Sequence, residues 1–366
     1  MGSASVAAMG IAVVFASCVS AALMLLVAAS AHARAKAGAA AGPGPGPAGG
    51  PGPAGPGPAG PGPAGPGPAG PGPSPVAPLA GGSGFGTKVF APYVLLSAYN
   101  YNFDFATGPC NYYTLAFVNG DTSNQPTFDG VQPLSVVSNA VKALRAKGGD
   151  VIASCGGADA STELGLVLTN VAQIQAGYQK LVTTLGLKWI DFDIEGYLAG
   201  NTASIDRRNQ AIAGLQRANP SLIVSYTLSA DTSGVNADSY ALLQNAKKNG
   251  VRVDVVNAML FEMPKNDSAS IIAGAKAVKA QIGAAGLNSS VGICIMIGQN
   301  DWGPATQLAD AVAVAAFAKS TPWVKLLTFW SLNRDNGSCA NSTKSASDTC
   351  SGLAQATYAF TNAMKF

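Results

Sequence analysis

From residue 87 to residue 366 the chain alternates short apolar runs with longer amphipathic stretches, and this alternation limits the folds it can adopt. The eight apolar runs, which we interpret as strands, cover residues 89–96, 113–119, 150–155, 189–195, 223–228, 253–263, 291–297 and 325–332. The helical patterns cover residues 136–147, 171–185, 206–218, 240–249, 268–285, 307–320 and 354–364. Strict alternation of strands with helices predicts an α/β fold of the (β/α)8 TIM-barrel type. A doubly wound open sheet is the alternative, but no glycine-rich nucleotide-binding turn follows the first run, which favours the closed barrel.

The chain ahead of this barrel has two parts of different composition. Residues 1–33 hold a long uncharged apolar stretch that ends in Ala31-His32-Ala33, a small-x-small pattern typical of a signal-peptide cleavage site. The stretch is also long enough to cross a bilayer, so a membrane anchor is the alternative. Residues 34–86 contain the unit PGPAG five times. Because proline, glycine and alanine offer little to bury, we expect this segment to be a disordered linker.

Charge and histidine content exclude several classes of function. Only 11% of the residues are charged, the formal net charge is +3, and no basic stripe is present, so nucleic acid is not an expected partner. The single histidine, His32, lies in the leader. Residues 87–366 therefore lack the histidine that Ser-His-Asp catalysis and His-ligated zinc sites require. The chemistry of the predicted barrel must rest on other groups, carboxylates first among them.

The fourth strand carries the carboxylates that point to a reaction. It reads Trp189-Ile190-Asp191-Phe192-Asp193-Ile194-Glu195. Because side chains alternate along a strand, Asp191, Asp193 and Glu195 face the same way, into the barrel. Such crowding raises the pKa of at least one carboxyl, which can then remain protonated as a general acid. A structural carboxylate network or a Mg²⁺ or Ca²⁺ site is the alternative interpretation.

This strand resembles the D-x-D-x-E signature of glycoside hydrolase family 18, the chitinases and related endo-β-N-acetylglucosaminidases. Ser154-Cys155-Gly156-Gly157 is similar to the family's S-x-G-G motif, and Trp330 to the tryptophan of its last strand. Residues 204–210 (SIDRRNQ) and 251–257 (VRVDVVN) resemble the bacterial-type subgroup, and Lys188 stands where many members have another Asp. The likeness extends over residues 87–366.

The resemblance implies a role for each of these residues. Glu195 would protonate the glycosidic oxygen, and the sugar's own acetamido oxygen would attack the anomeric carbon, an exception to the two-carboxylate scheme. Asp193 would stabilise the acetamido group, and Asp191 would share a hydrogen bond with Asp193 at rest. Ser154, Gly156, Gly157 and Trp330 would contact the substrate.

The sixth strand departs from the family pattern, which ends this strand with a Tyr and an Asp. In this alignment Glu262 replaces the Asp and Met263 replaces the Tyr, and methionine cannot donate a hydrogen bond. The loss of one donor at a reacting centre predicts reduced activity. The first strand also has Leu95 where relatives often have Asp.

Two further groups are candidates for sugar contact, and two cysteines for a disulfide. Asn300 and Trp302 follow the seventh strand, where a polar amide and an aromatic ring could meet a sugar. Cys339 and Cys350 flank a polar loop, and we expect them to form a disulfide.

Taken together, the sequence predicts a secreted, monomeric family 18-like hydrolase in residues 87–366 that cleaves β-1,4-linked N-acetylglucosamine in chitin. It predicts no cofactor and no metal ion, and contact with a membrane only if the leader is not cleaved. An endo-β-N-acetylglucosaminidase and a catalytically silent chitin-binding barrel are the alternatives.

Overall fold

The computed structural model describes residues 84–340 and 346–366. The leader (1–33) and nearly all of the linker (34–86) that we expect from the sequence lie outside the described residues. Phe85, which the sequence analysis placed in the linker, packs against Trp189 with ring centroids 5.2 Å apart and against Tyr112 at 5.0 Å. The packed part of the described chain therefore begins at Phe85. No helix among these described residues is long and apolar enough to cross a membrane.

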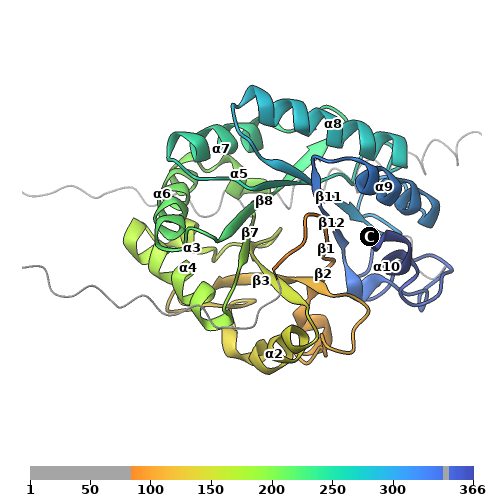
Figure 1. The fold of residues 1–366 in the computed structure, drawn as a ribbon, viewed down its shortest axis with the longest axis horizontal. Helices are drawn as coiled ribbons and strands as arrows, with labels where there is room; N and C mark the ends of the chain where they lie inside the picture. The colour runs from red at the N-terminus through yellow and green to blue at the C-terminus, as the bar shows by residue number, and fades with distance from the viewer. Residues whose placement is uncertain (1–83, 341–345) are drawn as a thin grey trace, which may run out of the picture. The chain divides into compact units, whose positions relative to one another are not determined.

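The strands form the inner ring of the domain and the helices lie outside it (Figure 1). The ring consists of β1 (Val89–Phe90) with β2 (Tyr93–Leu95), β3 (Tyr112–Gly120), β6 (Asp150–Gly156), β7 (Trp189–Asp193), β8 (Ile223–Asp231), β10 (Val255–Met259), β11 (Ser290–Met296) and β12 (Val324–Trp330). The outer layer consists of α2 (Ser138–Ala146), α4 (Val171–Leu185), α6 (Thr202–Ala218), α7 (Ala237–Lys248), α8 (Ser268–Ala284), α9 (Leu308–Ser320) and α10 (Ala359–Met364). Shorter pieces connect them: α3 (Leu164–Val167), α5 (Gly196–Gly200), β9 (Gly234–Val235), η1 (Leu96–Tyr99), η2 (Leu134–Val137) and η3 (Leu332–Arg334).

The first strand closes the ring by pairing on both sides. β1 pairs in parallel with β12, and β2 pairs in parallel with β3. The residues between β1 and β2 continue both ladders, because Ala91 N–H donates to Leu327 O at 3.0 Å and Thr114 N–H donates to Pro92 O at 3.0 Å. The parallel, TIM-barrel-like sheet that the sequence predicts is therefore confirmed.

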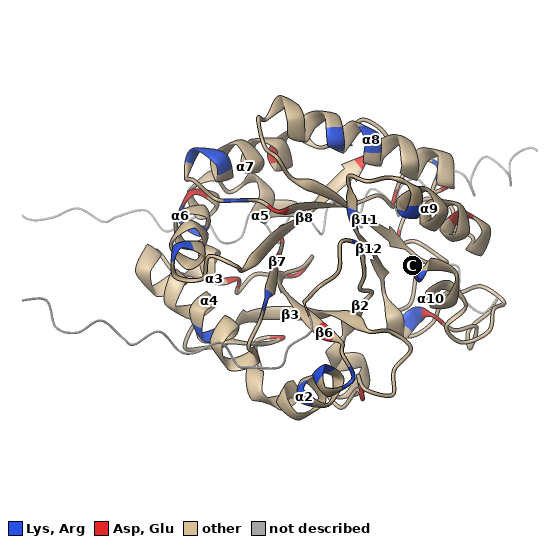
Figure 2. Ribbon diagram, in the orientation of Figure 1, with Lys and Arg blue, Asp and Glu red and all other residues tan. Residues whose placement is uncertain are grey.

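The core has one layer outside the ring and two inside it. The outer core lies between strands and helices and includes Ile190, Phe192 and Ile194, the apolar face of β7. The inner layer at the amino-terminal end of the strands contains Trp189, whose indole N–H donates to Ser225 Oγ at 2.9 Å. A second inner layer lies at the carboxyl-terminal end. Figure 2 shows that Lys and Arg lie mostly on the outer helices, while β7 brings acidic residues inside the ring.

The structure departs from the predicted elements in three places. The predicted strict alternation fails in the first unit, where the 3-10 helix η1 stands in place of an α-helix. After β3, the short strands β4 (Pro126–Phe128) and β5 (Gln132–Pro133) extend the sheet in antiparallel pairing. The sixth strand is shorter than predicted, because β10 ends at Met259.

Candidate active site

Asp191 is a buried carboxylate held by hydroxyl groups. Its side-chain oxygens accept hydrogen bonds from Ser154 Oγ at 2.7 Å, Ser225 Oγ at 2.5 Å, Thr227 Oγ1 at 3.0 Å and Tyr93 Oη at 3.1 Å. The strand register supplies two of these partners, since Ser154 and Ser225 lie directly opposite Asp191 on β6 and β8. Burial raises the pKa of Asp191, and the four hydroxyls oppose that rise. Asp191 is thus fixed within the barrel and 2% exposed.

Asp193 and Glu195 lie above Asp191 and face each other. Glu195 follows the end of β7 at the amino terminus of α5, and its side chain is hydrogen-bonded to Asp193. Burial, followed by the charges of Glu195 and Asp191, raises the pKa of Asp193 well above its ordinary value. Burial raises the pKa of Glu195 to about 7. Asp193 Oδ1 is buried and has no hydrogen-bond partner within the described chain. The pair can therefore hold a proton near neutral pH and still accept one more hydrogen bond.

The two glycines after Ser154 make room for this arrangement. Gly156 has φ of +112°, and a Cβ there would lie 2.0 Å from the carbonyl oxygen of Asp193. Gly157 has φ of +91°, and a Cβ there would lie 2.8 Å from the ring of Phe117. Its backbone N–H donates to the Asp193 carbonyl at 2.9 Å. The motif thus brings β6 against β7 below the carboxyl pair, while Ser154 is fully buried and acts through Asp191.

These carboxyls line a cleft of about 810 Å³ at the carboxyl-terminal end of the strands. Trp330 and Phe117 stack in it, with centroids 5.6 Å apart and planes at 16°, and Tyr93 adjoins Trp330 at 5.9 Å. Aromatic surfaces of this kind suit the apolar face of a pyranose ring. The cleft is also lined by Asn119, whose Oδ1 is buried without a partner in the described part of the chain. It combines an aromatic wall with polar groups able to bind a ligand.

The seventh-strand candidates occupy different positions from those predicted. Asn300 is 1% exposed, and its Nδ2 donates to Met296 O and Gly298 O. Its Oδ1 accepts from the backbone N–H of Glu262 at 3.2 Å. Asn300 therefore positions Glu262 and does not reach the cleft. Trp302 is 57% exposed and is not among the residues that line the cleft.

Glu262 lies on the cleft wall next to another carboxyl. Both Glu262 and Asp301 line the cleft. Burial, followed by the charge of Asp301 and a hydrogen bond with it, raises the pKa of Glu262. The charge of Glu262 in turn contributes to the raised pKa of Glu195.

Met263 lies in the core and not in the cleft, which corrects its predicted place in the site. Its side chain is 2% exposed and belongs to the outer core. Strand alternation does not extend this far, because β10 ends at Met259 and Glu262 adopts a left-handed φ of +54°. Phe261 lines the cleft instead.

Sequence reasoning missed the hydroxyl groups around Asp191. Tyr93 is buried inside the barrel and its hydroxyl lies 2.9 Å from Thr227 Oγ1. Asn257 Nδ2 donates to the same Thr227 oxygen at 3.0 Å. Alternation along each strand could have identified these residues, because it indicates which side chains point into the ring. Within the described residues, no group of His, Cys, Asp and Glu is arranged to hold a metal ion.

Comparison with known proteins gives matches to chitinases, while no family model matches the chain. A probable bifunctional chitinase/lysozyme of Escherichia coli is 36% identical over 161 residues, covering 42% of this chain and 18% of that protein. Endochitinase 11 of Metarhizium anisopliae is 36% identical over 158 residues, covering 42% of this chain and 30% of that protein. The chain thus spans less than a third of the length of these curated relatives.

Solved structures extend the likeness over the barrel. The catalytic domain of a hyperthermophilic chitinase from Pyrococcus furiosus superposes with a TM-score of 0.70 and 27% identity, covering 78% of this chain and 96% of that one. The catalytic domain of a family GH18 chitinase from the fern Peteris ryukyuensis shares the fold, with a TM-score of 0.52, 18% identity and coverage of 71% and 97%. In sequence and in fold, the chain is thus similar to chitinases.

The family 18 signature differs here from the expected resting arrangement in one contact. The resemblance implies a hydrogen bond between Asp191 and Asp193. In this structure the Asp193 side chain is hydrogen-bonded to Glu195, while Asp191 is surrounded by the four hydroxyls. The three carboxyls of the signature therefore form a buried anchor and a separate proton-sharing pair.

The raised pKa of Glu195 predicts a pH-dependent stability. A carboxyl whose pKa rises on folding, here from 4.5 to about 7, stabilises the fold fully below its unfolded pKa and loses that contribution as the pH rises through its folded pKa. The unfolding free energy of the wild type minus that of Glu195→Gln should therefore fall between pH 4.5 and 7 and level off above. Urea unfolding of both proteins over this range tests it, and a difference that does not change with pH would contradict the assignment.

The position of Met263 predicts that Met263→Tyr destabilises the barrel. A larger ring would have to fit a filled core, and its hydroxyl would need a partner there, so we expect a loss of about 1–3 kcal/mol in unfolding free energy. Phe261→Tyr is the matched control, because Phe261 lines the cleft and the added hydroxyl can face water. Chemical denaturation measures both. Equal stability of the two variants would show that Met263 is not in the core.

Proposed function

We propose that this chain hydrolyses β-1,4-linked N-acetylglucosamine chains, chitin or its oligomers, with retention of configuration. The observation that carries this proposal is the hydrogen-bonded pair of Asp193 and Glu195 in the wall of the cleft, with the pKa of Glu195 raised to about 7. The resemblance of the carboxylate strand to the family 18 signature and the chitinases among the similar proteins support the same substrate class.

Each residue of the pair has a step that its surroundings favour. Glu195, protonated below about pH 7, donates its proton to the glycosidic oxygen as the bond to the anomeric carbon breaks. The acetamido oxygen of the sugar attacks that carbon, and the acetamido N–H donates to Asp193. Asp193 Oδ1, which has no partner within the described chain, can accept this bond. Water then attacks the anomeric carbon and gives its proton back to Glu195.

Asp191 and the aromatic wall position these groups. The four hydroxyls keep Asp191 in place below Asp193, so its charge favours a cationic intermediate above it. Trp330 and Phe117 support the sugar ring. The wall after β10 presents Phe261, which cannot donate a hydrogen bond, so we expect slower turnover than in an enzyme whose cleft has a tyrosine hydroxyl at this place.

Glu195→Gln tests the assigned acid. Glutamine keeps the size of the side chain but has no acidic proton, so turnover of a fluorogenic chitooligosaccharide should fall by a factor of about 100 or more. Binding of the same sugar and the thermal midpoint at pH 5 should be retained. A variant that keeps most of the wild-type rate would refute Glu195 as the acid. A wild type that binds the sugar without turnover would favour a chitin-binding barrel.

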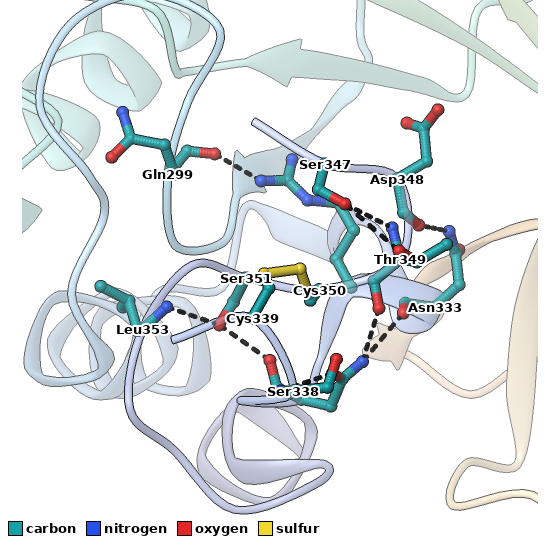
Figure 3. The surroundings of a disulfide bond; sticks show 12 residues. Gln299, Asn333, Ser338, Cys339, Ser347, Asp348, Thr349, Cys350, Ser351 and Leu353 are labelled. Carbon is teal, nitrogen blue, oxygen red and sulfur yellow. Dashed lines mark hydrogen bonds between the residues drawn. A yellow bond between two sulfur atoms is a disulfide. The ribbon is translucent and has the colours of Figure 1, made fainter. Parts of the chain in front are cut away.

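We also propose that the protein is secreted after removal of residues 1–33, with residues 34–86 as a spacer. The cleavage pattern at Ala31-His32-Ala33 and a disulfide support this proposal. Cys339 and Cys350 are bonded in the structure with their Cα atoms 5.9 Å apart, within the usual range (Figure 3). A loop closed in this way contributes roughly 2–4 kcal/mol by restricting the unfolded chain.

Peptide mapping without reduction tests the disulfide. The peptides that contain Cys339 and Cys350 should be linked in protein secreted by its natural host. Cys110, Cys155 and Cys294, which are free and buried, serve as internal controls and should react with an alkylating reagent only after unfolding. Two unlinked, reactive thiols at Cys339 and Cys350 would remove this support for secretion.

A further inference from the structure

A second hollow, of about 680 Å³, lies beside the cleft, and we call it the rim pocket. It is lined by Ala98 and Tyr99 of η1, by residues between Leu332 and Ser338 after β12, by Thr349, and by the stretch from Gln355 to Tyr358 before α10. None of the residues that line the rim pocket lines the cleft. The pocket is therefore a separate hollow on the same end of the barrel.

A thin wall separates the rim pocket from the cleft. Asn333 lines the pocket, and its Oδ1 accepts from the backbone N–H of Leu95 at 3.3 Å. Its Nδ2 donates to the carbonyl of Asp348, a contact visible in Figure 3. Leu95 and Asp348 both line the cleft. A single amide side chain thus joins the two hollows, and a ligand long enough to leave the cleft would meet the pocket.

Two tyrosines give the rim pocket aromatic surface. Tyr99 and Tyr358 are half-buried and pack against the outer core. Neither hydroxyl has a hydrogen-bond partner in the part of the chain that the structure describes. Burial, followed by nearby acidic groups that include Asp335, raises the pKa of both phenols. Both therefore stay protonated at physiological pH, where each can donate to and accept from a ligand hydroxyl.

A buried amide oxygen in the rim pocket lacks a donor. Gln355 Nε2 donates to Asp335 Oδ1 at 2.7 Å. Asp335 also accepts from Thr361 N–H and Thr361 Oγ1, each at 2.7 Å, and from Phe360 N–H at 3.1 Å. A carboxylate accepts from the amide nitrogen and not from its oxygen, so Asp335 fixes which way the amide points. Gln355 Oε1 is left buried without a partner among the described residues. A buried acceptor of this kind is costly unless an N–H or O–H group reaches it.

We propose that the rim pocket binds one or two N-acetylglucosamine units of a chitin chain outside the catalytic cleft. The proposal rests on the proposed function, which makes this polymer the ligand. The flat C–H face of the sugar would lie on a tyrosine ring, its hydroxyls would bond the phenols, and its acetamido N–H would donate to Gln355 Oε1. The volume lies within the range of small-molecule sites. Binding at two neighbouring places increases the avidity for a polymer without changing the affinity for a short oligomer.

Ala356→Trp tests the proposal by filling the pocket. Ala356 is exposed and lines the pocket, so the indole can occupy the sugar's place without disturbing the core. Ala354→Trp is the matched control, because Ala354 is exposed, two residues away and outside both hollows. Tyr358→Phe is a second variant that keeps the ring and removes one hydroxyl. Thermal midpoints establish that all three are folded.

Two measurements use the full-length protein. Equilibrium dialysis of N,N′-diacetylchitobiose is made against Glu195→Gln protein, which should not consume it, with and without each pocket substitution. We expect Ala356→Trp to remove one binding site and Ala354→Trp to remove none. Turnover of insoluble chitin by otherwise wild-type protein should fall about tenfold in Ala356→Trp and by less in Tyr358→Phe. Turnover of a fluorogenic chitobioside should stay within about twofold, because the cleft is intact.

The outcomes separate this proposal from the proposed function. If Ala356→Trp and Ala354→Trp behave alike in dialysis and on insoluble chitin, while the wild type cleaves the soluble substrate, the rim pocket does not bind chitin and the proposed function stands. If the wild type cleaves nothing but Ala356→Trp still removes a chitobiose site, the proposed catalytic function fails and the rim pocket stands.

Discussion

The hydrogen bonds that hold Asp191 determine how the site is built. A carboxylate 2% exposed inside a barrel is unstable without compensation, and four hydroxyls from the three strands β2, β6 and β8 provide it. This requirement fixes the register of β6, β7 and β8 relative to one another, because Ser154 and Ser225 must lie opposite Asp191. The same register carries Asp193 and Glu195 into the cleft. The catalytic pair is thus placed by the residue beneath it.

The three carboxyls have different roles because their buried surroundings differ. Asp191 has donors on all sides, whereas Asp193 has only Glu195 and one buried oxygen without a partner in the described chain. The first environment favours an anion and the second favours a shared proton. A spacing of two residues along one strand is enough to create this difference, because two residues of a strand extend about 7 Å and so place the second side chain nearer the open end of the barrel.

The fold was largely predictable from the sequence, and the site only in part. Each strand of the ring is an apolar run bounded by polar or glycine-rich segments, so its position is a local property. The contacts of Tyr93 and Thr227 with Asp191 depend on register between strands, which no local pattern encodes. Met263 was misplaced because it was aligned with the end of the family's sixth strand, whereas here the strand ends at Met259 and the chain turns at Glu262. Residue types were therefore easier to predict than the point at which a strand ends.

The divided first strand has a consequence for how this chain folds. Its two halves pair with β12 and β3, and Thr328 Oγ1 donates to Ala91 O across 237 residues of sequence. Lys88 also donates to the carbonyls of Ala318, Thr321 and Val324. The ring therefore cannot close until β12 has been synthesised, and closure over so long a loop is slow. Until then β1 and β11 lack β12 as their partner and present open edges, so a nascent or truncated chain would be prone to aggregate at those edges.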